Sequence, residues 1–428
     1  MRHHPIQSAF FSENRQRLRA LLPAGGMAIV NANDIPPTNA DGTLTGVPNS
    51  DLFYLSGVEQ EESLLVIFPD AHDEKHREIL FLRETSEHIA IWEGHKLTKP
   101  EARKASGIEH VMWLQDFPTI HRILMCQADT VFLNSNEHAR AGIQVQTRDA
   151  RFIQDTQAAF PLHRYERLAR LMHQLRPVKS KSEVDLIREA CGITRDGFLR
   201  VLPFVKPGVN ECEIEAEFAH EFIRRRARFS YNPIIASGKN SNVLHYLEND
   251  KTCRKGDVLL LDVGAAYANY AADMTRSIPV SGKFSKRQKE IYAAVLRVMR
   301  GCTAALVPGI LPRDWQKHAE HLMEEELLQL GLLKSRDIKK QAPDRPALKK
   351  YFMHGVGHPL GLDVHDVAVT GQPIQAGWVM TVEPGLYIPE EGFGIRLEND
   401  ILVTQDAPID LMADIPIEAA EIEELMKR

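Results

Sequence analysis

The chain has 428 residues, of which 43% are hydrophobic and 26% are charged, and its formal net charge is −6. This length allows two or three domains with substantial cores, and the slightly acidic balance argues against a general surface for nucleic acids. No stretch approaches the ~20 consecutive apolar residues of a membrane-spanning helix. The five cysteines are widely spaced, which argues against a disulfide framework and for a reducing compartment. We therefore expect a cytoplasmic protein that binds neither nucleic acid nor membrane.

Residues 1–176 alternate between strand-like and helix-like segments, which predicts one α/β domain. The strand candidates are short, rich in Ile, Val, Leu or Phe, and bounded by turn-forming residues. They are residues 27–33, 63–69, 78–84, 88–94 and 130–134. Helical patterns lie between them, for example at residues 12–22.

A second domain is expected over residues 177–428, because Pro177 disfavours a helix at the residue before it. Its helix starts have the spacing of capping boxes, in which the N-cap residue and a residue three positions later bond each other's backbone. The pairs are Ser180 with Glu183, Asn210 with Glu213, and Ser285 with Gln288. The expected elements are helices at 183–204 and 211–228, strands at 256–264 and 272–280, a helix at 284–298 with more helix following through about 331, and strands at 376–388 and 393–404. This order predicts an α+β domain with a duplicated helix-helix-hairpin unit.

Four acidic side chains stand in or beside the apolar strands of the two predicted hairpins. Asp262 lies in LLLDVG and Asp273 in YAADMTRS, whereas Glu383 lies in VMTVEPG and Glu398 in IRLEND. In an antiparallel hairpin, both acids of a pair can face the same side at similar height. Because an isolated buried carboxylate carries a large desolvation penalty, each acid would pair with its own Lys or Arg, lie at a strand end in water, or share a cation with the others. The symmetric placement favours two divalent cations, with one histidine completing the ligand shell.

The segment MHGVGHPLGLDVHD, residues 353–366, gathers three histidines around glycines and a proline. His354 and His358 are four residues apart, as in a zinc-binding HExxH helix, but the intervening GVG is a poor helix former and no Glu follows His354. A loop that supplies one imidazole to an oxygen-rich metal site fits the composition better. Such a ligand set suits Mn²⁺, although Co²⁺ or Zn²⁺ would also enter it.

Several segments resemble the proline-specific peptidases of the pita-bread fold, namely aminopeptidase P and prolidase. Five of them are DVG, ADMTR, HGVGHPLGLDVHD, VEPGLY and GIRLENDILVT. LHYLEND (244–250) resembles a family segment with an active-site histidine, and NSDLFYLSG with AIWEGHKL resembles the family's N-terminal domain. The resemblance covers most of the chain. It implies a pita-bread catalytic domain preceded by a smaller α/β domain of the creatinase and prolidase type.

The resemblance also implies roles for the site residues. The expected ligands of two divalent metal ions are Asp262, Asp273, His358, Glu383 and Glu398. Asp273 and Glu398 would bridge the ions, and a water between the ions would become a hydroxide nucleophile near neutral pH. Glu383 would also help to move the proton of this water. The residues expected to bind substrate and to shuttle protons are His245, His354 and His365.

Two further residues have alternative interpretations. Arg396, two positions before Glu398, would support the ligands or bind the far end of the substrate, or it would form a structural salt bridge with a nearby acid. Trp92 would be a core residue, or a lid over the active site from the N-terminal domain of the same or a neighbouring subunit. The resemblance implies a homodimer or homotetramer.

Three functions are compatible with the resemblance. The first is an Xaa-Pro aminopeptidase, which releases the first residue of peptides with proline in second position. The second is an Xaa-Pro dipeptidase (prolidase), and the third is a pita-bread binding protein without peptidase activity. Retention of all five expected ligands disfavours the third, and the IWEGHKL and LHYLEND segments favour the aminopeptidase. The link from VEPGLYIPEE to GFGIRLEND is shorter than in many such aminopeptidases, which would alter the rim of the pocket.

Overall fold

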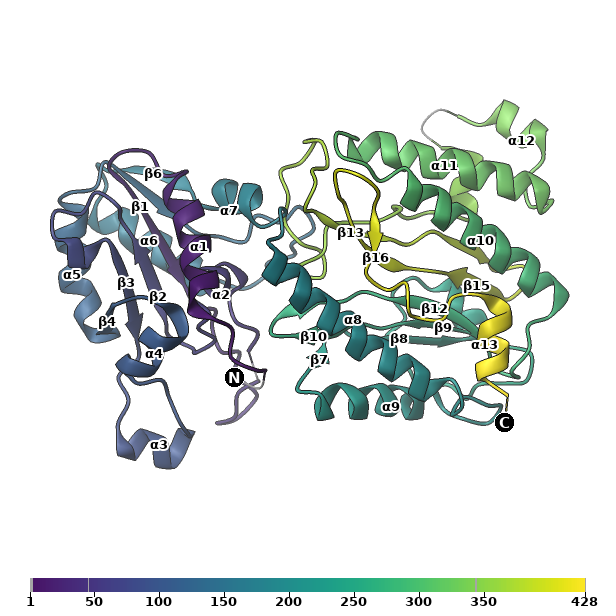
Figure 1. Cartoon of the computed structure of the whole chain (residues 1–428), viewed down its shortest axis with the longest axis horizontal. Coiled ribbons are helices and arrows are strands. Elements are labelled where there is room, and N and C mark those ends of the chain that lie inside the picture. The colour runs from purple at the N-terminus through teal and green to yellow at the C-terminus, as the bar shows by residue number, and fades with distance from the viewer. Residues whose placement is uncertain (1–2, 45, 343–344, 428) are drawn as a thin grey trace. The chain divides into compact units, whose positions relative to one another are not determined.

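The computed structural model describes residues 3–44, 46–342 and 345–427 of the chain. The chain divides into two compact units, the first over His3–Leu175 and the second from Arg176 onward (Figure 1). Among the described helices of both units, none combines the length and the apolar composition that crossing a membrane requires.

The first unit contains one six-stranded sheet in the order β4-β3-β2-β1-β5-β6. The pairs β3/β4, β1/β5 and β5/β6 are parallel, and the pairs β1/β2 and β2/β3 are antiparallel. The strands are β1 (Gly26–Asn31), β2 (Leu64–Ile67), β3 (Glu78–Leu82), β4 (His110–Trp113), β5 (Thr130–Leu133) and β6 (Arg164–Arg167). The helices are α1 (Ser8–Arg19), α2 (Ser50–Ser56), α3 (Glu87–Glu93), α4 (Lys99–Ser106), α5 (Phe117–Met125), α6 (Arg148–Ala159) and α7 (Ala169–Leu175).

Four of the five predicted strands of this unit are confirmed, and their apolar residues form its core. Ile29, Val66, Phe81 and Val131 are fully buried in one cluster, as expected for strands that bury their Ile, Val, Leu and Phe residues. Strands β4 and β6 were not predicted, because their residues HVMW and RYER lack an extended apolar pattern.

The predicted strand at residues 88–94 is wrong, because this segment forms helix α3. Ser86 accepts a hydrogen bond from the backbone N–H of Ile89, which caps the helix start. Both Ile91 and Trp92 are more than three-quarters exposed, at 78% and 77%, so the apolar run is not evidence of a buried strand. The exposure also contradicts the interpretation of Trp92 as a core residue, and its role as a lid stays a prediction.

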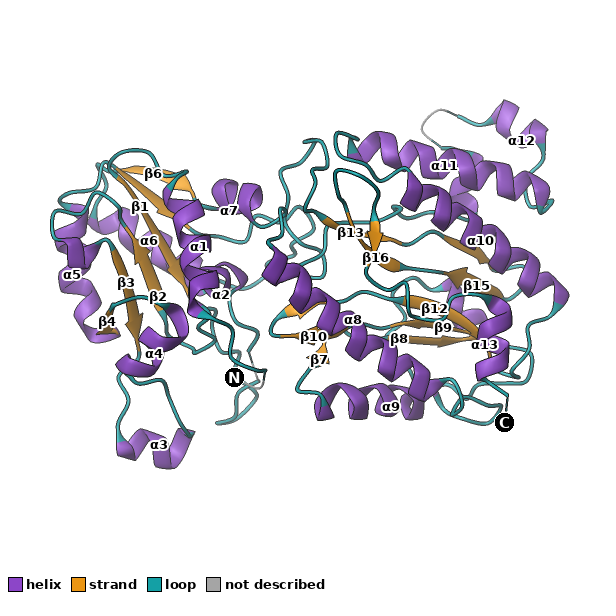
Figure 2. Ribbon diagram, viewed as in Figure 1, coloured by secondary structure: helices purple, strands orange, loops and turns teal. Residues whose placement is uncertain are grey.

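The second unit contains two helix pairs and two sets of antiparallel strands (Figure 2). Its helices are α8 (Lys181–Val201), α9 (Glu211–Arg224), α10 (Lys286–Ala304), α11 (Pro312–Gln329), α12 (Ser335–Lys340) and α13 (Ala419–Leu425). Its strands before α10 are β7 (Arg228–Phe229), β8 (Ile234–Ser237), β9 (Val258–Asp262), β10 (Ala265–Tyr267), β11 (Tyr270–Ala271) and β12 (Thr275–Pro279). Its later strands are β13 (Val379–Val382), β14 (Gly385–Ile388), β15 (Phe393–Arg396), β16 (Asn399–Leu402) and β17 (Ile409–Asp410).

Local capping explains where the long helices begin. The capping boxes predicted at Ser180, Asn210 and Ser285 are all present, at the starts of α8, α9 and α10. Helix α9 ends at Arg224, earlier than predicted, and Arg226 just beyond it adopts a left-handed φ of 65°. A residue with this backbone conformation cannot continue a right-handed helix.

The two halves of the second unit repeat one arrangement, as the sequence predicts. Helices α8 and α9 pack together and contact the strands β10, β7 and β8, whereas α10 and α11 pack together and α10 contacts β13, β14 and β15. Strand β9 pairs antiparallel with β12, and β13 pairs antiparallel with β16. Strand β15 contacts both β9 and β12, so the hairpins of the two halves meet in the interior of the unit.

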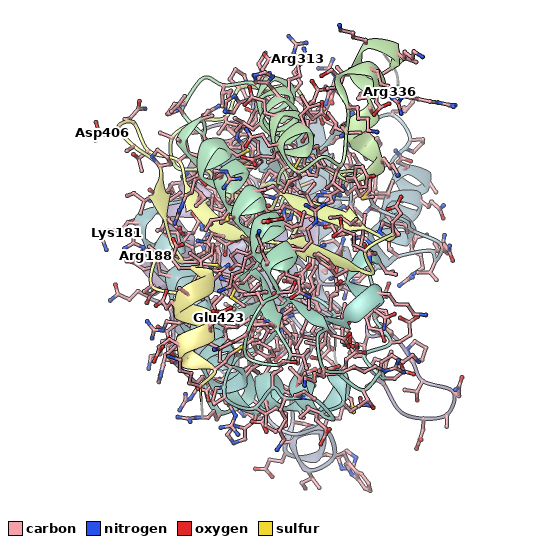
Figure 3. All side chains as sticks on the ribbon, turned by 90° about the vertical axis from the view of Figure 1, so that its right-hand side faces the viewer. Lys181, Arg188, Arg313, Arg336, Asp406 and Glu423 are labelled. Atoms are coloured by element: carbon pink, nitrogen blue, oxygen red, sulfur yellow. The ribbon has the colours of Figure 1, made fainter. Side chains whose placement is uncertain are left out.

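Charged residues cover the outer faces of these helices. Lys181, Arg313 and Arg336 extend away from the ribbon in Figure 3, and their side chains are 89%, 77% and 71% exposed. Solvated charges of this kind contribute little to stability. The acidic side chains in the interior of the same unit are therefore the exceptional feature.

Candidate active site

The first hairpin brings two acidic residues together at one end. Asp262 is the last residue of β9 and pairs in register with Thr275, the first residue of β12. Asp273 lies two residues before β12. The hydroxyl of Tyr231 lies 2.6 Å from Asp262 Oδ1 and 2.5 Å from Asp273 Oδ1. The two carboxylates therefore share one neighbour, as the antiparallel pairing predicts.

The second set of strands places the two glutamates at its junctions. Glu383 directly follows β13, and Glu398 lies between β15 and β16. Pairing of β13 with β16 and of β14 with β15 makes both junctions fall at the same end of this sheet region. The backbone N–H of Glu398 donates to the carbonyl of Thr275 at 3.1 Å, which connects this end to the first hairpin.

His358 joins the acids where the hairpins meet. One ligand atom each from Asp273, His358 and Glu398 lies within 4.8 Å of the others, and all three residues are buried. His358 Nε2 lies 3.5 Å from Asp273 Oδ2 and 3.7 Å from Glu383 Oε1. Two carboxylates and one imidazole at this spacing form a donor set that fits a divalent cation.

Hydrogen bonds orient the candidate ligands. The His358 Nδ1 atom lies 3.0 Å from the Pro359 carbonyl oxygen. Because a carbonyl oxygen only accepts, Nδ1 carries the proton in this contact and Nε2 directs its lone pair toward the acids. Thr275 Oγ1 donates to Glu398 Oε2 at 2.6 Å, and Asp400 Oδ2 accepts from the backbone N–H of Asp273 at 3.1 Å.

Burial and mutual repulsion change the proton affinity of these acids. Burial, followed by the charge of Asp262, raises the pKa of Asp273 well above its usual value. Burial, followed by the charge of Asp273, does the same to the pKa of Glu398. Burial also raises the pKa of Glu383 to about 7, against the opposing effects of His358 and Arg396. A cluster of carboxylates that disfavours its own ionisation is the electrostatic setting that a bound cation relieves.

Arg396 makes contacts that match its structural alternative. Its guanidinium is buried and donates to Asp262 Oδ2 at 2.5 Å, to the hydroxyl of Tyr387 at 2.7 Å and to Thr275 Oγ1 at 3.2 Å. Each guanidinium nitrogen therefore already has a protein partner. Its role in binding substrate stays a prediction, whereas its support of the candidate ligand Asp262 is a direct contact.

His354 is the end of a hydrogen-bonded chain that starts at Arg396. Arg396 donates to the Tyr387 oxygen, which lies 2.8 Å from His354 Nε2, and His354 Nδ1 lies 2.7 Å from the Gly355 carbonyl. The geometry places the His354 proton on Nδ1 and lets Nε2 accept from Tyr387. Burial, and then the charge of Arg396, lowers the pKa of His354 to about 3. His354 is therefore neutral at physiological pH.

The remaining two histidines lie at different depths. The ring of His365 is half-buried and packs edge-to-face on His358, with 4.3 Å between the ring centroids. His245 is exposed, and its charge contributes to the lowered pKa of His354, which places it in the neighbourhood of that ring. Their predicted contacts with substrate stay predictions.

Sequence reasoning missed the hydroxyl-bearing residues of the site. Thr275 and Tyr387 lie within the segments ADMTR and VEPGLY that carry the resemblance, so their position could have been noticed. Tyr231 lies outside every such segment, and its contact with Asp262 spans 31 residues along the chain. No spacing pattern in the sequence points to it.

The chain is similar to known proteins over most of its length. Residues 185–405 match metallopeptidase family M24, and residues 11–132 match the aminopeptidase P N-terminal domain. The Xaa-Pro aminopeptidase of Escherichia coli is 34% identical, with 97% of each chain covered. The human Xaa-Pro aminopeptidase 3 is 31% identical, and the match covers 92% of this chain and 78% of that protein.

Solved structures show the same architecture. Aminopeptidase PepP of Pseudomonas aeruginosa matches with a TM-score of 0.89 at 29% identity, covering 99% of this chain and 98% of that one. Zinc-substituted E. coli aminopeptidase P in complex with product matches with a TM-score of 0.85 at 32% identity, covering 99% of each chain. The chain belongs to the aminopeptidase P family of M24 metallopeptidases, and its second unit has the pita-bread fold.

Proposed function

We propose that this protein is an Xaa-Pro aminopeptidase that hydrolyses the bond between the first residue of a peptide and a proline in second position. The observation that carries the proposal is the buried convergence of Asp273, His358 and Glu398. These residues lie far apart in the sequence, and a shared cation explains why the fold places them together. Similarity to Xaa-Pro aminopeptidases over almost the full chain supports the substrate class.

Five residues would hold two divalent metal ions, namely Asp262, Asp273, His358, Glu383 and Glu398. Their oxygen-rich composition suits Mn²⁺, which we propose as the physiological metal, with Co²⁺ or Zn²⁺ as substitutes. When bound, such ions supply Lewis acidity that polarises the scissile carbonyl and lowers the pKa of water toward neutrality.

The protein's own groups would manage the protons. Glu383, whose Oε1 lies 3.7 Å from His358 Nε2, would help to move the proton of the attacking water, as the family resemblance implies. Neutral His354 offers no charge but holds Tyr387 and Arg396 in one hydrogen-bonded chain. We propose that His245, His354 and His365 contact the substrate and shuttle protons, and that they stabilise the charge that develops on the scissile carbonyl.

Preference for proline has a physical basis. An X–Pro bond lacks the amide N–H that most peptide-binding sites use, and the ring fixes φ. A dedicated site can therefore accept the ring without offering a partner to an N–H group. The alternative function is prolidase activity. It is favoured by the short connection between β14 and β15, a tight turn flanked by the paired residues Ile388 and Phe393. A short connection changes the rim of the pocket and with it the length of peptide that fits.

The assembly and location of the protein are inferred from the family resemblance and from the cysteines. We propose a homodimer or homotetramer in the cytoplasm, without a nucleic-acid or membrane partner. The five free cysteines, Cys126, Cys191, Cys212, Cys253 and Cys302, support a reducing compartment. We also propose domains at residues 1–176 and 177–428, close to the division of the structure at Arg176.

A substrate panel tests the proposed function. The protein is incubated with Mn²⁺ and Ala-Pro, Ala-Pro-Ala or Ala-Ala-Ala, and the released alanine is measured. Cleavage of Ala-Pro-Ala supports the aminopeptidase, whereas cleavage of Ala-Pro alone supports prolidase. If neither proline peptide is cleaved with Mn²⁺, Co²⁺ or Zn²⁺, the proposal is wrong.

A further inference from the structure

A cluster of buried charges joins the loop that carries His358 and His365 to the start of the second unit. Asp366 is 3% exposed, Arg176 4% and Lys179 7%. Lys179 Nζ donates to Asp366 Oδ2 at 2.8 Å, and Arg176 Nη2 forms an ion pair with Asp366 Oδ1. Arg176 also donates to Asp363 Oδ2 at 2.6 Å. None of these residues belongs to the candidate metal ligands.

The cations of this cluster come from the start of the second unit. Arg176 and Lys179 are the first and last residues of the segment RPVK, just before α8. Lys179 Nζ also donates to the carbonyl of Arg176 at 2.6 Å, and its backbone N–H donates to the carbonyl of Gly377 at 2.8 Å. The ammonium group is therefore held by the Arg176 carbonyl of its own segment as well as by Asp366 of the loop.

The loop 359–366 packs closely against the charged groups of Asp366 and Lys179. The backbone N–H of Asp366 donates to the Pro359 carbonyl at 2.8 Å, which closes the loop between the two histidines. A side chain at Gly361 would place its Cβ 2.1 Å from Asp366 Oδ2 and 2.8 Å from Lys179 Nζ. Gly361 is thus required because the charged groups occupy the space that a side chain would take.

The two ends of this closed loop carry the active-site imidazoles. His358 directly precedes Pro359, and His365 directly precedes Asp366. Because Pro359 and Asp366 are hydrogen-bonded to each other, the two rings meet edge-to-face with centroids 4.3 Å apart. A shift of Asp366 would therefore move the ring of His365 relative to His358.

We propose that Asp366 and Lys179 are positioning residues, whose buried ion pair fixes the loop 359–366 and thereby sets the orientation of the His365 ring against His358. The inference rests on the proposed function, because it assumes that His365 acts on the substrate.

The electrostatics of the cluster suit this role. Burial alone would raise the pKa of Asp366, but the charges of Arg176 and Lys179 outweigh burial and hold this pKa below its usual value. Buried ion pairs contribute little net stability compared with well-packed apolar residues, but in some proteins they specify a single conformation. A pair of this kind is suited to specifying one loop conformation.

The test compares three single variants of the full-length protein. Asp366→Asn leaves two cations without their shared counter-charge and is the severe variant. Lys179→Met removes one cation, keeps the length of the side chain, and leaves Asp366 paired with Arg176. The control is Glu326→Gln, which breaks the pair between Glu326 and Arg297, with contacts of 2.6 and 2.7 Å, on the helices α10 and α11.

Two readouts separate positioning from simple stabilisation. With Mn²⁺ and Ala-Pro-Ala, Lys179→Met is expected to lower kcat roughly 10- to 100-fold with little change in KM, as for other residues that orient active-site groups. In the NMR spectrum of metal-free Lys179→Met, the ring C–H resonances of His358 and His365 are expected to shift relative to those of the metal-free wild type. Glu326→Gln is expected to change neither.

The NMR measurement needs neither metal nor substrate, so it remains decisive if the wild-type protein fails to cleave Ala-Pro-Ala. Movement of both ring signals in Lys179→Met, and not in Glu326→Gln, supports the positioning role. If Lys179→Met lowers only the melting temperature while kcat and both ring signals stay at wild-type values, the inference is overturned. Failure of Asp366→Asn to fold leaves the Lys179→Met comparison intact.

Discussion

Arg396 on β15 donates a hydrogen bond to Asp262 on β9 at 2.5 Å, and this ion pair joins the two hairpins across 134 positions of the chain. The side chains are 5% and 13% exposed. Charge neutralisation of Asp262 is therefore built into the fold, whereas the other acids of the site depend more on a bound cation.

Arg396→Met should destabilise the metal-free protein by about 3–5 kcal/mol, because it leaves the largely buried Asp262 carboxylate without its counter-charge. The loss should be smaller with Mn²⁺ bound, since the cation offers Asp262 another counter-charge. Chemical denaturation with and without Mn²⁺ measures both values. Lys181→Met, which breaks an exposed pair with Asp185, is the control and should change the free energy of unfolding by less than about 1 kcal/mol. An equal loss with and without metal would show that Asp262 is not a ligand.

Removal of metal should lower the melting temperature. Burial and repulsion between carboxylates raise the pKa values of Asp273 and Glu398. A bound cation offsets this repulsion and so stabilises the folded protein. A metal at 100 times its dissociation constant stabilises the folded state by about 2.7 kcal/mol. Differential scanning calorimetry before and after chelation measures the shift, and an unchanged melting temperature would argue against a shared cation.

The two neighbouring imidazoles should differ in their effect on metal binding. His358→Ala removes a candidate ligand and should reduce metal content, because Nε2 is the atom that faces Asp273 and Glu383. His365→Ala should retain metal and lower turnover of Ala-Pro-Ala. Metal content by mass spectrometry and kcat by alanine release provide the comparison. Equal loss of metal in both variants would contradict the assignment of roles.

A histidine of the first unit should make the protein sensitive to acid. Burial, and then the charge of His163, lowers the pKa of His121 from 6.5 to about 4, and its ring stacks on Phe117 at 4.8 Å. Because the folded pKa lies below the unfolded value, the stabilisation is complete above pH 6.5 and is lost as pH falls toward 4.

Between pH 6.5 and 4, this one buried imidazole should lower the free energy of unfolding by about 3 kcal/mol. His121→Phe removes the titrating group and should flatten the dependence of the free energy of unfolding on pH between these limits. Urea denaturation of both proteins at a series of pH values checks this. Parallel curves for the wild type and His121→Phe would show that His121 does not titrate in this range.

Local signals explain which parts of the fold could be predicted. The capping pairs at Ser180, Asn210 and Ser285 act within four residues, so the sequence reveals the helix starts directly. The segment around Trp92 misled the same reasoning, because its apolar residues lie on an exposed helix instead of a buried strand. An apolar composition does not by itself distinguish these cases.

The candidate site also contains residues that the sequence identifies and residues that it does not. Its acids and His358 stand in segments whose spacing and resemblance identify them. The residues that hold the site in place lie far from it in the sequence. Tyr231 contacts Asp273 across 42 positions, and Lys179 contacts Asp366, the neighbour of His365, across 187. Such contacts depend on how strands and loops converge, which spacing along a single sequence does not encode.

The central claim is that buried acids and one imidazole converge to hold divalent metal ions. Anomalous X-ray diffraction from crystals grown with Mn²⁺ tests it most directly. We predict two manganese peaks, roughly 3.5–4 Å apart, within bonding distance of Asp273, His358 and Glu398. Crystals that diffract well at saturating Mn²⁺ but show no anomalous peak among these three side chains would contradict the account.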